Sequence, residues 1–507
     1  MPYPWKDLRS WINEEEELGN VLRIKEPIAC GDYNNIVDIA PEEPRLPGKI
    51  PKTELRSLVA YLHSLEKNPI GFIEKPVYNR PDVPVLVNLW PDLERALRGV
   101  GCKDIREAAD KFKRAISNPG EIEVVSKKNA PCKEVIIPEK DVDLTKLPRT
   151  YVEFNRWPWS PVNSVLVLYD PESGLHSLGN VRTGYFEWRD ANPETPYPED
   201  KRKKCLVATL IYAGPFESDS GRYYREKFLK KGKNMPGAIT WGHPTDVHVI
   251  AASRYLRWPE MGDEYKILAG FRGEPIEVVE SETIPGLMVP AYAEWVIEGE
   301  FTLEREPQPK HAEDIASGYM IGGDLCPVFR VKCVTHRKSP WWVPTWSNSG
   351  LCHMGVHTGL IHLTFADLDP LVYLRSQHFQ VKNVHAFHGG TEIIVVQLEV
   401  DGADKPWPHY GKTVLGALYG SRLGYGGTTT KIMIAVGPDI DPYDPNDVLW
   451  AVATRAMPYS DSIIIPQGLA EWGDPGAKPG PAGWKTCLLY TSPSPRDLST
   501  SRMPSSA

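Results

Sequence analysis

The chain has 507 residues, enough for two or three domains with buried cores. Its formal net charge of -8 and its isoelectric point near 6.0 argue against non-specific nucleic-acid binding. No apolar run is long enough to span a bilayer, and the N-terminus lacks the charged-then-apolar pattern of a secretory signal. Eight cysteines without a CxxC pair are typical of a reducing compartment. We therefore expect a cytoplasmic protein that does not bind nucleic acid and is not an integral membrane protein.

The N-terminal segment, residues 1–120, is predicted to be an α/β region. A helix should begin near Asp7, because the apolar residues Leu8, Trp11 and Ile12 recur with helical spacing. VLRI and PVLVN are typical of strands, and DIREAADKFKRAI is typical of a charged amphipathic helix.

Short strand-like runs dominate residues 121–325, including VNSVLVLYD, HSLGNVRTGYFEW and CLVATLIYAG. They predict a partly closed β-barrel or a sandwich, with the helix REKFLKK inserted. Residues 232–300 alternate apolar runs with Gly, Pro and acidic turns, which favours packed strands and one buried helix. Strands and helices alternate again over residues 326–486, where we expect an α/β oligomerisation domain.

The final 21 residues, 487–507, read CLLYTSPSPRDLSTSRMPSSA and have no apolar period. They are similar to translated sequencing-adapter read-through, and we interpret them as an artefact that replaces the genuine C-terminus. An ordinary disordered tail is the alternative. We expect no fold in this segment.

Ordered motifs in the middle of the chain resemble the UbiD family of reversible decarboxylases. Residues 232–300 contain MPxAxxxGxP, AAS, DEYxxxAGxRGEPxEVV and VPAxAExVIEGE in that order. The flanking runs APCKEVIIPEKDVDLTKLP, VTHRKSP and KIMIAVGPDIDPYDPNDVLWAVATR extend the resemblance to about position 470. It implies an α+β and α/β multidomain fold, with a central split β-barrel that binds prenylated FMN between two α/β regions.

The resemblance also implies a reaction, the non-oxidative decarboxylation or carboxylation of an aromatic or α,β-unsaturated acid. Decarboxylation leaves negative charge on carbon, which no side chain holds well, so a cofactor must take it. A flavin prenyltransferase would supply the prenylated FMN, and the enzyme would be a homo-oligomer. Two alternatives stay open: a non-catalytic subunit of a multi-subunit carboxylase, and a relative acting on an aryl-CoA or a phosphorylated phenol.

Arg182 is the first candidate site residue. It ends DPESGLHSLGNVR, which resembles the family pattern DPx(T/S)GxxNxxxxR. A guanidinium presents a rigid, permanently charged fork that can hold a substrate or cofactor anion. The alternative is a surface arginine at a strand end. Where the family has a metal-binding asparagine, this chain has Ser177.

The resemblance implies further cofactor ligands. Glu264, in MGDEYKILAG, matches a metal-ligand glutamate for Mn²⁺ or Mg²⁺, although an exposed loop carboxylate would look the same. Asp219 stands where the family has a histidine ligand, but Asp219 or Ser220 could equally cap a helix. By analogy, K⁺ would bind backbone carbonyls between Ser253 and Leu256.

The resemblance is weakest where the family has its two catalytic acids. The family's two catalytic glutamates lie in a PEGPFGE-like loop, whereas this chain reads EGEFTLEREPQPKHAEDIASGY. Glu306 and Glu313 are the nearest acids, with Asp314 a close rival, and they would act as general acid and base beside Arg182. A lid for another substrate or a charged solvated turn are the alternatives.

Overall fold

The structure is a computed structural model. It describes residues 3–38, 49–151, 164–186, 197–210, 217–307, 312–313, 320–321, 325–344, 358–387, 393–400, 409–421, 423, 430, 432–457, 459–466 and 485–490. In the part of the chain so described, none of the helices is both long and apolar enough to cross a membrane.

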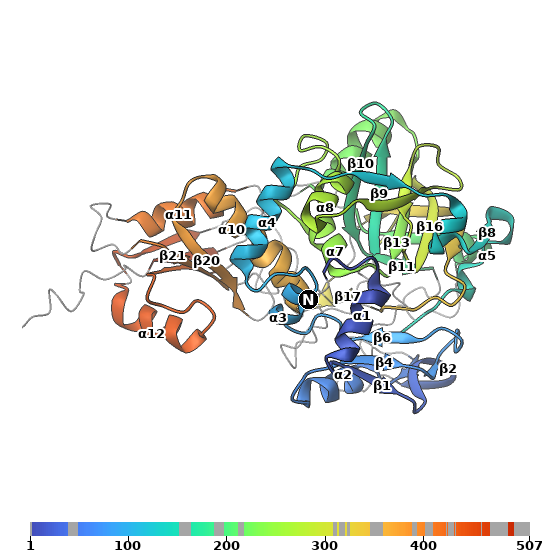
Figure 1. Cartoon of the computed structure of the whole chain (residues 1–507), viewed down its shortest axis with the longest axis horizontal. Coiled ribbons are helices and arrows are strands. Elements are labelled where there is room, and N and C mark those ends of the chain that lie inside the picture. Colours follow the sequence, from blue (N-terminus) through green and yellow to red (C-terminus); the bar gives the residue numbers. More distant parts are fainter. Residues whose placement is uncertain are drawn as a thin grey trace, which may run out of the picture.

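The N-terminal region contains the predicted helix and strands (Figure 1). Helix α1 (Leu8–Glu17) begins after Asp7, whose carboxylate accepts the Ser10 N–H at 2.8 Å. The predicted strands are β1 (Val21–Ile24) and β6 (Val85–Val87), joined through β4 (Ile70–Ile73). The other elements here are β2 (Ile28–Asp38), β3 (Lys49–Thr53), β5 (Pro76–Val77), α2 (Leu55–Ser64), α3 (Leu93–Arg98) and α4 (Ile105–Ser117).

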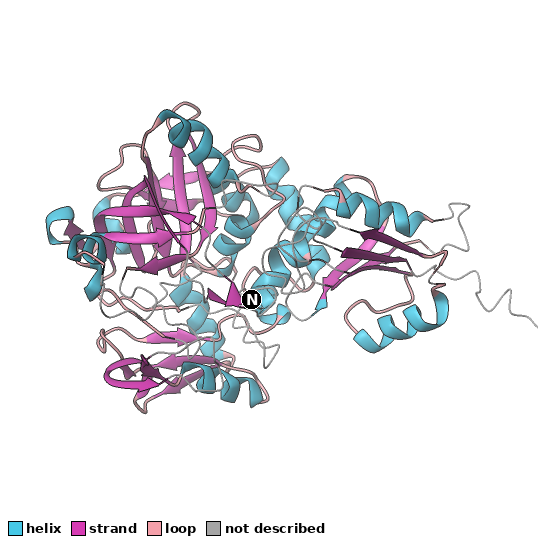
Figure 2. Ribbon diagram, turned by 180° about the vertical axis from the view of Figure 1, so that it is seen from behind, coloured by secondary structure: helices cyan, strands magenta, loops and turns pink. Residues whose placement is uncertain are grey.

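The middle region of the chain forms an eight-stranded antiparallel sheet, at the upper left in Figure 2. Its strand order is β10-β9-β13-β16-β19-β12-β11, and β8 pairs with β19. The strands are β8 (Val135–Pro138), β9 (Ser164–Asp170), β10 (Leu175–Val181), β11 (Thr183–Tyr185), β12 (Cys205–Ala208), β13 (Met235–Trp241), β16 (Trp295–Pro307) and β19 (Leu325–His336).

This sheet is curled, because a connection of one residue joins the strands at its two ends. Strands β10 and β11 lie at opposite ends of the strand order, yet only Arg182 separates them in sequence. The Cα atoms of Val181 and Thr183 can therefore be no more than about 7 Å apart. The sheet must bend until its two ends meet at Arg182.

The two faces of the curled sheet belong to different cores. Val165 and Val167 join the core cluster that contains α7 (Thr245–Ala252) and α8 (Glu264–Arg272), whereas Leu166 and Leu168 join a second cluster. This is the period of two expected of a strand buried on both faces. The prediction of one buried helix in residues 232–300 is wrong, because this stretch forms two.

The C-terminal region is an α/β layer structure, as predicted. Its sheet has the order β20-β21-β22-β24-β23. Ile394 and Val396 pack into the core shared with α10 and α11, while Val395 packs on the opposite side with residues of α12. The elements are β20 (Val381–Ala386), β21 (Ile393–Leu398), β22 (Ile432–Val436), β23 (Ser462–Pro466), β24 (Lys485–Tyr490), α10 (Leu368–Ser376), α11 (Tyr410–Tyr419) and α12 (Pro445–Arg455).

Two predicted boundaries are corrected by the strand pairing. Strand β19 belongs to the central sheet, so that region extends to residue 336 rather than 325. Residues 487–490 form most of β24 and pair in parallel with β22, so the expectation of no fold from residue 487 fails for these four residues. Residues 491–507 lie outside the described residues.

The smaller elements connect these regions. Strands β7 (Ile122–Val124), β14 (Ile276–Glu280) and β15 (Met288–Pro290) form a three-stranded sheet, and β17 (Ala312–Glu313) pairs with β18 (Met320–Ile321). The short helices are α5 (Glu199–Lys204), α6 (Asp219–Tyr223) and α9 (Thr358–Ile361).

A buried carboxylate ties α1 to the central sheet. Glu294 is fully buried and accepts two hydrogen bonds of 2.8 Å from the Arg9 guanidinium. Arg337 lies 3.5 Å away, and the Trp341 N–H donates to the same carboxylate at 2.9 Å. Because Arg337 also pairs with Asp7 at 2.8 Å, two carboxylates and two guanidinium groups balance each other where three distant segments meet.

We expect Glu294→Gln to lower the free energy of unfolding by about 3 kcal/mol, because the substitution removes the buried carboxylate that pairs with the partly exposed Arg9 guanidinium. Urea denaturation would measure the change. The control is Lys6→Ala, which removes an ion pair to Glu277 on a side chain that is 57% exposed and should cost less than about 1 kcal/mol. Equal losses in the two variants would contradict this account.

Candidate active site

The start of helix α8 is bound to the edge of strand β10. The His176 N–H donates to the Asp263 carboxylate at 2.8 Å. Two residues further on, the Leu178 N–H donates to the Glu264 carboxylate, which also accepts the Ser177 hydroxyl at 3.0 Å. An edge strand leaves alternate N–H groups without a neighbouring strand, and here two carboxylates accept them.

Glu264 is a buried acid with an altered proton affinity. Its pKa is raised to about 8, mainly by burial and to a smaller extent by the nearby carboxylates Asp219 and Asp263. The hydrogen bonds from Leu178 and Ser177 act in the opposite direction. The alternative that Glu264 is an exposed loop residue is therefore wrong.

Asp219 lies close enough to Glu264 to raise the pKa of that residue, but Asp219 does not cap helix α6. Ser218 is the N-cap of α6 and accepts the Gly221 N–H at 3.0 Å, so the alternative of a cap by Asp219 or Ser220 is wrong. The Asp219 carboxylate instead accepts the Trp258 N–H at 3.0 Å. Its other oxygen lies 3.3 Å from Arg222.

Arg182 occupies the junction where the sheet closes. It follows the last residue of β10 and precedes β11, and its carbonyl accepts the Thr209 N–H at 2.8 Å. Ser177, the Glu264 contact, lies five positions earlier, within β10. The structure thus places Arg182, Ser177 and Glu264 along one edge of the curled sheet.

The loop predicted to hold K⁺ is fixed by a residue that the sequence did not single out. The Ser253 hydroxyl donates to Asp369 at 2.8 Å and accepts the Leu256 N–H at 3.2 Å. Asp369 also accepts the N–H groups of Arg254 and Tyr255. Asp369 is fully buried, which raises its pKa to about 6. In the sequence its signal is only an acid at the start of an apolar helix, DLDPLVYL.

The predicted acid pair is only partly described. Glu306 lies near the end of β16 and forms an ion pair with Lys201, which also binds Glu304 at 2.5 Å. Glu313 lies in β17, paired with Met320, but its side chain and all of Asp314 are outside the described residues. The structure therefore gives Glu306 a lysine partner that the sequence did not predict.

Family models identify the class of protein. Residues 123–349 match the 3-octaprenyl-4-hydroxybenzoate carboxy-lyase Rift-related domain, and residues 366–489 match the C-terminal domain of the same carboxy-lyase. The chain is thus a carboxy-lyase by family. It belongs to the UbiD family.

Solved structures of UbiD-class proteins have the same fold. The closed form of vanillic acid decarboxylase from Sedimentibacter hydroxybenzoicus is 21% identical, with a TM-score of 0.75 over 99% of this chain and 95% of that one. HmfF from Pelotomaculum thermopropionicum, in complex with FMN, is 20% identical, with a TM-score of 0.73 over 99% and 97%. The apo 3,4-dihydroxybenzoic acid decarboxylase AroY from Klebsiella pneumoniae is 21% identical, with a TM-score of 0.73 over 99% and 97%.

The raised pKa of Glu264 predicts a pH-dependent stability. Between its ordinary pKa of 4.5 and its folded pKa of about 8, the folded chain keeps a proton that the unfolded chain has lost. The contribution of this group to stability is therefore complete below about pH 4.5 and falls as the pH rises to about 8. Glu264→Gln cannot ionise and should lack this component of the slope.

Urea denaturation in the presence of a chelator, at several pH values from 5 to 9, would test this prediction. The difference between wild type and Glu264→Gln isolates the one group from the rest. Glu260→Gln is the control, because Arg222 lowers the pKa of Glu260 and its contribution is lost toward low pH instead. Parallel profiles for wild type and Glu264→Gln would rule out a buried, protonated Glu264.

Proposed function

We propose that this chain is a prenylated-FMN-dependent enzyme that decarboxylates, or carboxylates, an aromatic or α,β-unsaturated acid without net oxidation. The observation that carries the proposal is the placement of Arg182, Ser177 and Glu264 along the β10 edge of a UbiD-family fold. Solved UbiD-class structures of HmfF with FMN and with prenylated FMN support a flavin here.

The proposed cation ligands are Glu264, Ser177 and Asp219. All three offer oxygen donors, which suit Mn²⁺ or Mg²⁺ bridging to a cofactor phosphate. A buried carboxylate whose pKa lies near 8 gains most from a bound cation, because the cation favours its charged form. The loop from Ser253 to Leu256 is proposed to hold K⁺ through its carbonyls, with Asp369 fixing the N–H groups of that loop.

The side chains have separate proposed roles. When bound, prenylated FMN would supply the electron sink for the carboxylate carbon. Arg182 would hold the substrate carboxylate through two hydrogen bonds and orient it. Glu306 and Glu313 are proposed to transfer the proton, and Glu306 would first have to leave Lys201. A separate flavin prenyltransferase would supply the cofactor.

Co-expression with a flavin prenyltransferase and anaerobic purification would test the proposal. We expect a bound modified flavin in the mass and absorbance spectra, and CO₂ release from at least one acid in a panel of aromatic and acrylic acids. Arg182→Lys should reduce turnover by about 100-fold or more, because an ammonium cannot replace a two-point contact.

The matched control is Arg330→Lys, an exposed arginine of the same sheet that pairs with Asp200 and should keep full activity. Normal turnover in Arg182→Lys would remove Arg182 from the site. A flavin-free protein that releases no CO₂ and copurifies with related subunits would favour the non-catalytic subunit instead.

Homo-oligomerisation through the C-terminal region is also proposed. Helix α12 exposes Leu449 and Trp450, and the edge strand β23 exposes Ile463 and Ile464. Exposed apolar side chains beside a strand edge that no other described strand pairs with are typical of an interface. One solved HmfF structure is an evolved dimeric form.

Trp450 is 51% exposed, so we expect Trp450→Glu to lower the molar mass measured by light scattering to that of a smaller assembly, while the fold is kept. The control is Leu22→Glu, which places the same charge on an apolar residue of the N-terminal sheet and should leave the mass unchanged. An unchanged mass in Trp450→Glu, or a monomeric wild type, would contradict the proposed interface.

A further inference from the structure

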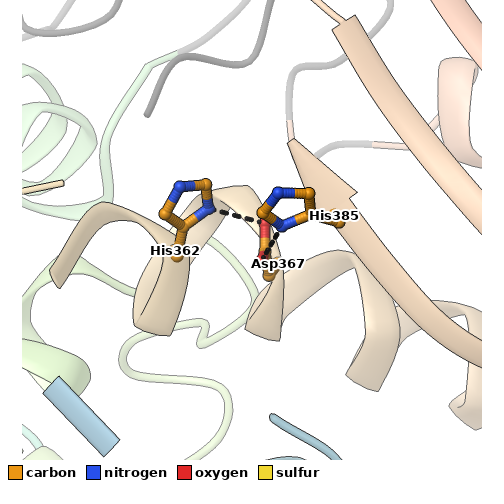
Figure 3. Close-up of side chains that lie close together, drawn as sticks. All are labelled: His362, Asp367 and His385. Atoms are coloured by element: carbon orange, nitrogen blue, oxygen red, sulfur yellow. Dashed lines mark hydrogen bonds and ion pairs between the residues drawn. The ribbon is translucent and has the colours of Figure 1, made fainter. Parts of the chain in front are cut away.

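Three metal-ligand side chains meet beside the C-terminal sheet (Figure 3). His362 begins the π-helical turn His362–Ala366, Asp367 follows that turn directly, and His385 lies in β20. One ligand atom from each residue lies within 4.8 Å of the others. Among the described residues, this is the one group of three or more His, Cys, Asp or Glu side chains whose ligand atoms all lie this close together.

The separations suit a shared ion. His362 Nδ1 is 3.1 Å from one carboxylate oxygen of Asp367, and His385 Nδ1 is 2.9 Å from the other. Ligands bound at about 2.0–2.1 Å around a tetrahedral zinc ion are separated by about 3.3 Å. The same separations also fit two hydrogen bonds. The burial of the cluster and the partners of its carboxylate therefore have to distinguish a metal site from a hydrogen-bonded cluster.

Among the described residues, the carboxylate of the cluster has no lysine or arginine partner. Asp367 is fully buried, and its described contacts are the two imidazoles and the Ala386 N–H at 3.0 Å. The imidazole rings are stacked, with centroids 4.8 Å apart and an angle of 21° between planes. A buried carboxylate whose described side-chain partners are two imidazoles and one backbone N–H favours a bound cation.

The donors are held in place by their surroundings. Each carboxylate oxygen of Asp367 lies within hydrogen-bond distance of one imidazole nitrogen. The Ala386 N–H orients the carboxylate, as outer partners do in known metal sites. The rings of Tyr443 and Phe387 lie 4.6 and 5.8 Å from that of His385 and shield it on its sides.

We propose that His362, Asp367 and His385 bind one divalent transition-metal ion, with zinc the best match. Two imidazoles and one carboxylate favour zinc over Mg²⁺ or Ca²⁺, which take oxygen ligands. This site is separate from the oxygen-donor site at Glu264 and does not depend on the proposed reaction. The ion would link the helical turn before α10 to strand β20.

The test uses the full-length protein without flavin, stripped by a chelator, loaded with Zn²⁺ and desalted. We expect about one tightly held zinc ion per chain by mass spectrometry, with at least about tenfold weaker binding in His385→Gln and Asp367→Asn. X-ray absorption at the zinc edge should show two imidazole ligands. Glu264→Gln should keep this zinc ion, because it alters the other proposed site.

The histidine control is His63→Gln, which removes a ring bonded to Asn68 at 3.2 Å and should keep the zinc ion. Circular dichroism would establish that His385→Gln and Asp367→Asn are folded. If either variant does not fold, the zinc-edge spectrum of the wild type decides the matter. The absence of tightly held zinc, equal zinc in wild type and folded His385→Gln, or a spectrum without imidazole would overturn the proposal and leave a hydrogen-bonded His–Asp–His cluster.

Discussion

A one-residue connection constrains the whole central domain. Strands β10 and β11 are the first and last members of the sheet, and Arg182 alone joins them. The sheet can satisfy this connection only by curling, and the curl brings β12 and β19 round toward β9 and β10. Any side chain at position 182 would stand at this junction. Because the residue is an arginine, with a rigid and permanent charge, we propose a chemical role for the junction in addition to its structural one.

The edge position of strand β10 explains the buried acids beside it. Among the described strands β10 pairs only with β9, so its outward N–H groups need acceptors, and the carboxylates of Asp263 and Glu264 provide them. The same contact takes Glu264 out of water and raises its pKa. The Glu264 carboxylate therefore couples the stability of the β10 edge to its own protonation. A cation bound there would reverse the balance, because the charged carboxylate would become the favoured form.

The sequence predicted best what depends on near neighbours. The start of α1 follows from Asp7 and the spacing of Leu8, Trp11 and Ile12, and the strands of the central and C-terminal sheets follow from their apolar runs. Arg182, Ser177 and Glu264 could be named as candidates because family motifs surround them. Their meeting along β10 is a property of the folded chain, since 87 positions separate Ser177 from Glu264.

The features that the sequence did not predict also depend on contacts between distant residues. Assigning β19 and β24 to their sheets requires long-range pairing, which local composition does not report. The lysine partner of Glu306 lies 105 positions away, and Asp369 bonds a loop 116 positions earlier. The His362–Asp367–His385 cluster has no recognisable ligand spacing, because one of its members comes from a different element. Side chains that act together through tertiary contacts leave no periodic signal in the sequence.

The start of α10 is fixed on two sides by two acids. Asp367 bonds His385 and the Ala386 N–H in the C-terminal sheet, whereas Asp369, two residues later, bonds the loop that follows α7. Both carboxylates are fully buried, so breaking either set of bonds would leave polar groups without partners. The C-terminal sheet cannot shift relative to the central domain without straining one of these contacts or moving the Ser253–Leu256 loop with it. The chain thus has a physical connection between its C-terminal sheet and the loop proposed to hold K⁺, made of two side chains on one turn of helix.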